Sequence, residues 1–120
     1  MDILSVLTQL KEIKMVKEIR ILLDYQCYPV WLYDEDGDVI DTLLPEELRE
    51  DAELDKKFDD IQSRYDGLFV DNSHEFAYLG FPTEKEKEKF LSDLNLAILE
   101  LKEKINGKYP VIDDSNLSLK

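Results

Sequence analysis

The regular apolar spacing between Phe90 and Ile105 constrains the fold of this chain more than any other feature. Apolar residues recur there at three- and four-residue intervals, which is the period of one face of a helix. Those residues are Phe90, Leu91, Leu94, Ile98, Leu101 and Ile105. Thr83 suits the cap at the start of this helix, and Gly107 suits its end. The spacing therefore predicts a long helix whose apolar face must be covered by a second layer of structure.

Two further helices are predicted upstream. One begins near Pro45 and ends before Gly67, because proline suits the first turn of a helix. Its apolar face follows the same spacing and consists of Leu54, Phe58, Ile61 and Tyr65. Another helix is predicted from Asp2 to Leu23, from a slowly drifting apolar stripe. The segment Ile19 to Leu23 also fits a strand, since a short apolar run does not fix the period, but we favour helix.

Two hairpins are predicted between these helices. Tyr28 to Tyr33 is rich in aromatic and β-branched residues, Asp36-Gly37 is a tight-turn signal, and residues 38–42 resume the strand pattern. A second pair of short strands is predicted at Leu68 to Val70 and Phe76 to Phe81, on either side of a polar turn.

The first hairpin carries apolar surface on both faces. Because side chains alternate along a strand, Val30 and Leu32 share one face while Trp31 and Tyr33 share the other. Helices would cover one face, and a binding partner is expected to cover the second.

The order of elements predicts an α+β fold with a small antiparallel sheet packed against helices, arranged as helix, hairpin, helix, hairpin, helix. Residues 1–107 are assigned to a single globular domain, and residues 108–120 to a loosely attached or disordered tail. No secretion signal or membrane-spanning run is recognised, so a cytoplasmic protein is expected. Cys27 is the only cysteine, which excludes an internal disulfide.

The negative charge is concentrated in the middle of the chain. Sixteen acidic and only four basic residues lie between Asp34 and Glu75, so this third carries −12 of the net charge of −13. A field of one sign attracts basic surfaces and speeds their association. It also repels phosphates, which argues against nucleic acid as a partner. The charge therefore predicts a basic protein partner.

Catalytic, metal and cofactor sites find little support. His74 is the sole histidine, and no glycine-flanked serine or activated cysteine accompanies it. The acidic loop from Asp34 to Asp38 lacks the glycine and the glutamate that an EF-hand needs at its sixth and twelfth positions. The four glycines are scattered and form no phosphate-binding loop. We predict a protein that is not an enzyme, with no cofactor and no metal, although a weak cation site at the loop stays an alternative.

The predicted partner-binding surface combines acidic residues for steering with aromatic anchors. It consists of Trp31, Tyr33, Asp34, Asp36, Asp38, Glu46, Glu47, Glu50, Asp55 and Asp59. In such a surface, carboxylates stand in for the phosphates of a nuclease substrate. The alternative interpretation is that these acids only keep the protein in solution.

The runs Tyr28 to Asp41, Leu44-Pro45-Glu46-Glu47-Leu48 and Arg64-Tyr65-Asp66 resemble small acidic bacterial proteins grouped with the immunity proteins of polymorphic toxin systems. The resemblance covers residues 25–81. It implies a cytosolic antidote that binds a cognate toxin domain, often a nuclease. The charge distribution and this resemblance lead to the same hypothesis, an immunity-type inhibitor of a basic toxin. A small regulatory or scaffold domain without a toxin partner is the alternative.

Overall fold

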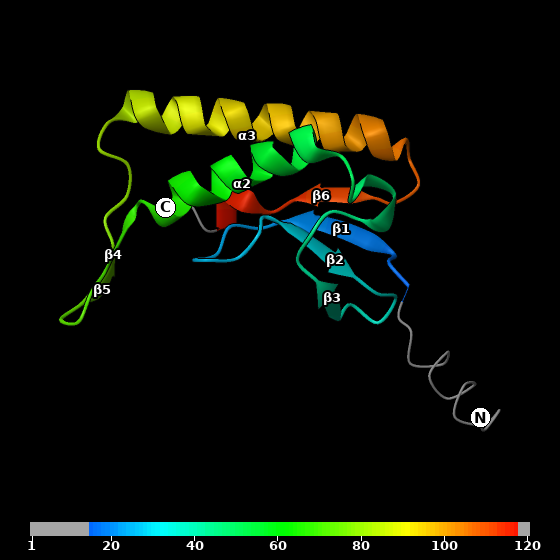
Figure 1. Ribbon diagram of the computed structural model, residues 1–120, viewed down its shortest axis with the longest axis horizontal. Helices are drawn as coiled ribbons and strands as arrows, with labels where there is room; N and C mark the ends of the chain where they lie inside the picture. The colour runs from blue at the N-terminus through cyan, green and yellow to red at the C-terminus, as the bar shows by residue number, and fades with distance from the viewer. Residues whose placement is uncertain (1–14, 118–120) are drawn as a thin grey trace, which may run out of the picture.

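The computed structural model describes residues 15–117 (Figure 1). The described elements are β1 (Glu18–Ile21), β2 (Val30–Tyr33), β3 (Val39–Asp41), the 3-10 helix η1 (Glu46–Leu48), α2 (Ala52–Asp66), β4 (Phe69–Asp71), β5 (Phe76–Tyr78), α3 (Glu84–Ile105), β6 (Val111–Asp113) and the 3-10 helix η2 (Ser115–Leu117). The predicted α+β class is confirmed. Neither α2 nor α3 carries an apolar stretch long enough to cross a lipid bilayer.

A four-stranded sheet forms one layer of the molecule, with strand order β3-β2-β1-β6. β1 pairs with β2 in antiparallel register, placing Ile19 opposite Leu32 and Arg20 opposite Trp31. β1 also pairs with β6, but in parallel register. The sheet is therefore mixed, whereas the sequence predicted an antiparallel one. Figure 1 shows α2 and α3 together on one side of this sheet, with the β4–β5 hairpin projecting from one end.

The core lies between the sheet and the two helices. Along β1 and β2 the side chains alternate between buried and half-buried, so each strand turns one set of apolar residues toward the helices. The predicted apolar faces of α2 and α3 are buried against that set. The buried residues from these four elements include Ile19, Ile21, Val30, Leu32, Leu54, Phe58, Ile61, Tyr65, Phe90, Leu94, Ile98, Leu101 and Ile105.

The predicted helix from Asp2 to Leu23 is wrong where the structure describes it. Residues 18–21 form β1, and the part of the prediction over residues 1–14 lies outside the described residues. Ile19 and Ile21 are fully buried, while Glu18 and Arg20 are half-buried on the other face. The short apolar run is compatible with a helix or a strand, and pairing with β2 on one side and β6 on the other makes it a strand. With two α-helices in the described range, the predicted order of three helices and two hairpins is not confirmed.

The second predicted helix begins later than Pro45. Residues Glu46–Leu48 form the short helix η1, and α2 starts only at Ala52. Asp51 caps α2, because its carboxylate accepts a hydrogen bond from the Leu54 backbone N–H at 3.0 Å. The chain therefore turns between the two helical segments instead of continuing as one helix.

The segment from residue 108 is attached to the sheet, contrary to the predicted loose tail. β6 lies beside β1, and the Ile19 N–H donates to the Pro110 carbonyl at 2.9 Å. At the other end of this pairing, the Asp114 N–H donates to the Ile21 carbonyl at 2.9 Å. Ser115 is buried. The predicted boundary at residue 107 thus separates β6 from the sheet it belongs to.

Both predicted hairpins are confirmed, and so is the long helix that ends the pattern. β2 pairs with β3, and β4 pairs with β5, each in antiparallel register. Thr83 caps α3 by accepting a hydrogen bond from the Glu86 N–H at 3.1 Å. Asn106 and Gly107 adopt positive φ angles of 52° and 78°, which terminate the helix.

Candidate functional site

The sheet turns Trp31 and Tyr33 away from the helices, as the alternation predicts. The Arg20 guanidinium lies 5.0 Å from the centre of the Tyr33 ring. The same guanidinium pairs with Glu18 at 2.6 Å and with Asp114 at 3.6 Å. Tyr33 is therefore already engaged within the chain, and it lies beneath a cation.

Three of the predicted site residues meet in the turn between β2 and β3. Asp34, Asp36 and Asp38 each place one carboxylate oxygen within 4.8 Å of the others. Asp34 is only 6% exposed, and its carboxylate accepts hydrogen bonds from the backbone N–H groups of Asp36 at 2.9 Å and Asp38 at 3.0 Å. This residue shapes the turn, while Asp36 and Asp38 are exposed on the surface. The predicted absence of a metal stays a prediction.

Glu46 and Glu47 lie on η1, next to the chain that follows α3. Glu47 pairs with Lys108 at 3.3 Å. Although desolvation opposes the effect, hydrogen bonds from its own backbone, Tyr109 and Lys108 lower the pKa of Glu47. These residues line a hollow of about 610 Å³ that also contains Lys17 and Arg49. This part of the predicted surface is therefore partly neutralised by the chain's own basic residues.

Asp55 and Asp59 lie one turn apart on α2. Tyr28 donates a hydrogen bond from its hydroxyl to Asp55 at 2.9 Å, and burial together with this bond raises the Tyr28 pKa. Desolvation, followed by repulsion from Asp55, raises the pKa of Asp59. Neither carboxylate has an ion-pair partner within residues 15–117. A nearby cation would relieve the repulsion between them.

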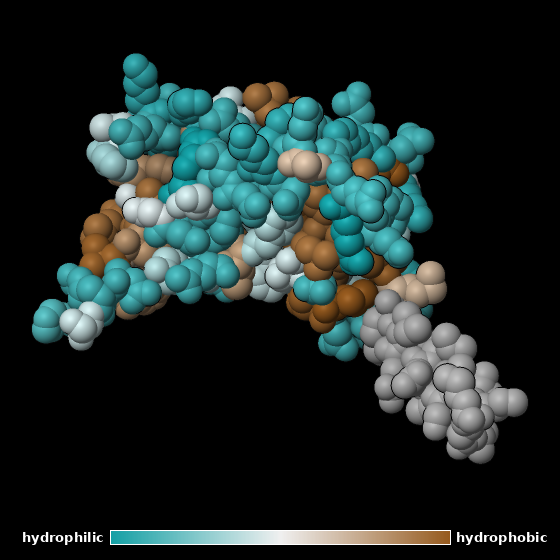
Figure 2. All heavy atoms as spheres, in the orientation of Figure 1, coloured by the Kyte–Doolittle hydropathy of each residue, from teal (hydrophilic) through white to brown (hydrophobic). Residues whose placement is uncertain are grey.

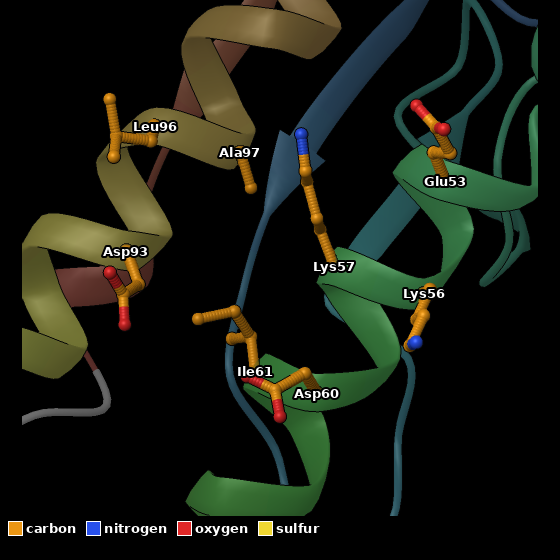
Figure 3. A pocket seen from close by; sticks show the side chains of 8 residues that line it. All are labelled: Glu53, Lys56, Lys57, Asp60, Ile61, Asp93, Leu96 and Ala97. Atoms are coloured by element: carbon orange, nitrogen blue, oxygen red, sulfur yellow. The ribbon is translucent and has the colours of Figure 1, made fainter.

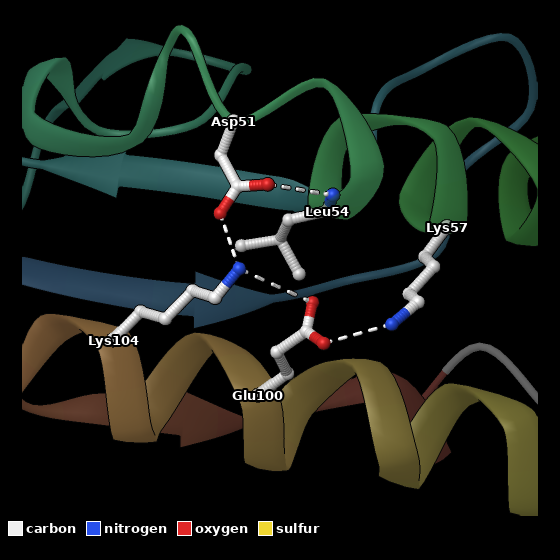
Figure 4. A network of polar contacts seen from close by, with 5 residues as sticks. All are labelled: Asp51, Leu54, Lys57, Glu100 and Lys104. Carbon is white, nitrogen blue, oxygen red and sulfur yellow. Dashed lines mark hydrogen bonds and ion pairs between the residues drawn. The ribbon is translucent and has the colours of Figure 1, made fainter.

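Ion pairs join α2 to α3. The residues that form them are not among the site residues predicted from the sequence. Figure 4 shows Lys104 between Asp51 and Glu100, with Lys57 bonded to the other Glu100 oxygen at 2.8 Å. The hydrogen bond from Lys104 lowers the pKa of Asp51. Asp51 thus caps α2 and contacts α3 at once. The signal available beforehand was the N-cap preference of an Asp just before the apolar spacing begins.

A groove of about 480 Å³ lies between the outer faces of the two helices (Figure 3). Its lining residues are Glu53, Lys56, Lys57, Asp60, Ile61, Asp93, Leu96 and Ala97. Carboxylates and ammonium groups surround this groove together, so its charge selects for neither sign of ligand.

A second hollow, of about 500 Å³, lies at the junction of the sheet and the β4–β5 hairpin. We call it the aromatic hollow, and its lining residues are Leu22, Leu23, Asp24, Trp31, Tyr65, Phe69, Tyr78 and Leu117. Trp31 is the predicted site residue found here. Asp24 was missed because it lies outside the acidic stretch from Asp34 to Glu75, and Leu117 because it was assigned to a loose tail. In Figure 2, hydrophobic residues gather at the base of this hairpin, whereas hydrophilic ones dominate over the helices.

The structure thus divides the predicted site residues among several places. Asp34, Asp36 and Asp38 stand on the hairpin turn, while Glu46 and Glu47 stand on η1 and Asp55 and Asp59 on α2. Glu50 is exposed in the link between η1 and α2. Their grouping into one binding surface stays a prediction.

Comparison with known protein families assigns the class of this fold. The Serratia CdiI immunity protein-like family matches residues 17–115, which run from just before β1 to just after β6. The chain belongs to this family of immunity proteins. The resemblance inferred from the sequence is confirmed, and the family supports a role as a toxin inhibitor. No curated protein sequence matches the chain.

Proposed function

We propose that this protein is a cytoplasmic inhibitor, without enzymatic activity, that binds and neutralises a basic cognate toxin of the nuclease class. Family membership supports the inhibitor role. The observation that supports a basic partner is a set of outward carboxylates for which residues 15–117 provide no ion-pair partner. These include Asp38, Glu46, Glu50, Asp55 and Asp59.

These exposed carboxylates are complementary in charge to a cationic groove that binds the phosphate backbone of a nucleic acid. Exposed carboxylates attract that groove over a distance of about 10 Å at ordinary ionic strength, and so accelerate encounter. The Asp55–Asp59 pair adds a local reason, because a lysine or arginine between the two would remove their mutual repulsion. Occupation of the groove would exclude the nucleic acid substrate.

Coexpression with a candidate cognate toxin domain tests the proposal. Cells that produce the toxin domain should survive only when this chain is also present, and the two proteins should copurify. Nuclease activity of the purified toxin should fall as the inhibitor is added in stoichiometric amount. Survival without inhibition of nucleic acid cleavage would reject the nuclease class, and death of the coexpressing cells would reject the inhibitor role.

A further inference from the structure

The aromatic hollow differs in its charge from three other hollows in the described part of the chain. The helix groove contains Lys56 and Lys57, and the hollow beside η1 contains Lys17 and Arg49 among its basic residues. A fourth hollow is lined by residues that include Arg64 and Lys89. The aromatic hollow has one ionisable carboxylate, Asp24, and no lysine or arginine in its lining. Its uncompensated charge favours a cation.

Hydrogen bonds fix the position of Asp24, and its charge has no ion-pair partner within residues 15–117. Its carboxylate accepts a hydrogen bond from the Tyr25 N–H at 2.8 Å, and its carbonyl accepts one from the Gln62 amide at 2.8 Å. Within residues 15–117 no basic side chain pairs with this exposed carboxylate. A fixed, exposed carboxylate at the mouth of an apolar hollow is a suitable partner for a cationic group.

The aromatic walls are fixed by their own contacts. The Phe69 ring lies 5.3 Å from the Tyr65 ring and 5.1 Å from the Tyr78 ring, measured between centroids. Tyr78 is nevertheless 38% exposed, and Leu117 is 66% exposed. Ring faces and an aliphatic side chain are thus open to a ligand. Planar cations stack well on such rings.

Trp31 supplies an independent indication that a ligand completes this site. Its indole N–H is buried and has no hydrogen-bond acceptor within the described part of the chain. A buried donor without an acceptor is unfavourable, and native proteins rarely leave one so. A rotation of the Trp31 side chain on binding would bring this N–H to the hollow, where the backbone carbonyl of an inserted peptide segment would satisfy it.

We propose that the aromatic hollow receives an arginine side chain of the cognate toxin. The guanidinium pairs with Asp24 and stacks on an aromatic wall, and a carbonyl of the same toxin segment accepts from the Trp31 indole. Lysine fits less well, because its compact, strongly hydrated ammonium group neither stacks nor forms paired parallel hydrogen bonds. This inference rests on the proposed function, since it names the group through which the toxin is anchored.

Trp31 is the only tryptophan in the chain, so its fluorescence reports on the hollow directly. The probe is acetyl-Gly-Arg-Gly-amide, compared with the lysine peptide of the same length and charge. The arginine peptide should change Trp31 emission saturably and bind about tenfold more tightly than the lysine peptide. Asp24→Asn, which retains an acceptor for the Tyr25 N–H, should abolish this preference, whereas the matched control Glu103→Gln on the exposed side of α3 should retain it. Equal responses to both peptides, or no saturable response, would overturn the proposal.

The second measurement uses the toxin domain itself. Asp24→Asn and Tyr78→Ala should each speed dissociation of the complex by about tenfold or more, while Glu103→Gln leaves dissociation nearly unchanged. If the toxin is neutralised but Asp24→Asn dissociates like Glu103→Gln, the arginine site fails and the inhibitor function stands. If the toxin is never bound while the arginine peptide still occupies the hollow, the proposed function fails instead.

A variant lacking residues 118–120 separates a toxin ligand from the chain's own C-terminal segment. It should have the same Trp31 emission and the same arginine-peptide affinity as the full chain. If the deletion alone shifts the emission and strengthens peptide binding about tenfold, the segment occupies the hollow, and the proposal is overturned.

Discussion

At the scale of single residues, carboxylates that look equivalent in the sequence have three different roles. Asp34 is buried and organises a turn, and Asp51 caps α2 while contacting Lys104. Asp59 has no such partner within residues 15–117, and the charge of the nearby Asp55 repels it. A count of charge along the chain cannot separate these roles, because each depends on which backbone N–H or basic side chain the fold brings near. The count predicted the sign of the partner's charge but not which carboxylates contact the partner.

Replacing Asp59 by asparagine should stabilise the fold at pH 7 by about 0.2–0.5 kcal/mol, the cost of a like-charge pair one turn apart. Desolvation and Asp55 raise its folded-state pKa above 3.8, so the ionised form opposes folding. The gain should be absent below pH 3.8, should appear as pH rises through the raised pKa, and should then stay constant. Urea denaturation of both proteins across this range measures it. Asp60→Asn is the control, since it removes an ion pair with Arg64 and should not stabilise the fold.

Calcium should not stabilise the β2–β3 turn specifically. The Asp34 carboxylate is already bonded to two backbone N–H groups, which compete with a cation for its oxygens. Millimolar calcium should therefore raise the melting temperature no more than a monovalent salt of equal ionic strength. A saturable calcium effect that disappears in Asp36→Asn would show that the three carboxylates form a metal site.

At the scale of elements, local patterns predicted what depends on near neighbours in sequence. The hairpin β2–β3 and helix α3 follow from turn residues, caps and apolar spacing within a short stretch of chain. β6 does not, because it is defined by its pairing with β1 across almost the whole described chain. β1 is likewise settled only by its partners on both sides, β2 and β6. Val111 and Ile112 form too short a run to reveal a strand alone. The aromatic hollow was missed for the same reason, since the segment after β1, the β4–β5 hairpin and η2 must meet to form it.

Leu94→Ala should lower the free energy of unfolding by about 2–5 kcal/mol, because the side chain is 1% exposed and its removal leaves a cavity. The matched control is Leu96→Ala on the same helix, where the side chain is 63% exposed and the change should stay within about 0.5 kcal/mol. Chemical denaturation measures both. Similar losses for the two variants would mean that the apolar stripe does not define the buried face of α3.

Ending the chain after Pro110 should destabilise it by more than about 1.5 kcal/mol, since this removes the half-buried Val111 and the buried Ser115 and exposes the edge of β1. Ending it after Leu117 should have little effect on unfolding. Thermal and urea denaturation of the two truncated chains distinguish these expectations. Equal stability would restore the interpretation of residues 108 onward as a loose tail.

At the scale of the whole molecule, we expect one surface to attract the toxin over a distance and a different surface to hold it once it is bound. The exposed carboxylates extend over the first hairpin, η1 and α2, whereas the open aromatic surface lies by β2 and the β4–β5 hairpin. Long-range attraction depends on the sum of charges, and dissociation depends on the few groups buried in contact. The exposed carboxylates should therefore attract the toxin before it contacts the aromatic surface.

Reversing Glu50 and Asp59 to lysine should slow association with the toxin domain and weaken its dependence on salt between about 50 and 200 mM. Reversing Glu88 and Glu103 on α3 changes the net charge equally and should affect association less, because these residues lie outside the acidic stretch. Trp31→Ala should mainly speed dissociation. Stopped-flow and surface-binding kinetics resolve the two rates. Equal effects of both double reversals would mean that net charge alone guides the encounter.

The parallel pairing of β1 with β6 also bears on when this protein becomes an antidote during its synthesis. β1 leaves the ribosome early, and its neighbour β6 follows only after α2, the β4–β5 hairpin and α3 have been made. Contacts so distant in sequence form slowly, and domains complete their folding only when the needed segments have emerged. A nascent chain that stops before residue 111 would contain the β2–β3 hairpin and the acidic residues, but its sheet would lack β6. Protection of the cell would then begin with finished molecules, which ties immunity to the completion of each chain and not to its start.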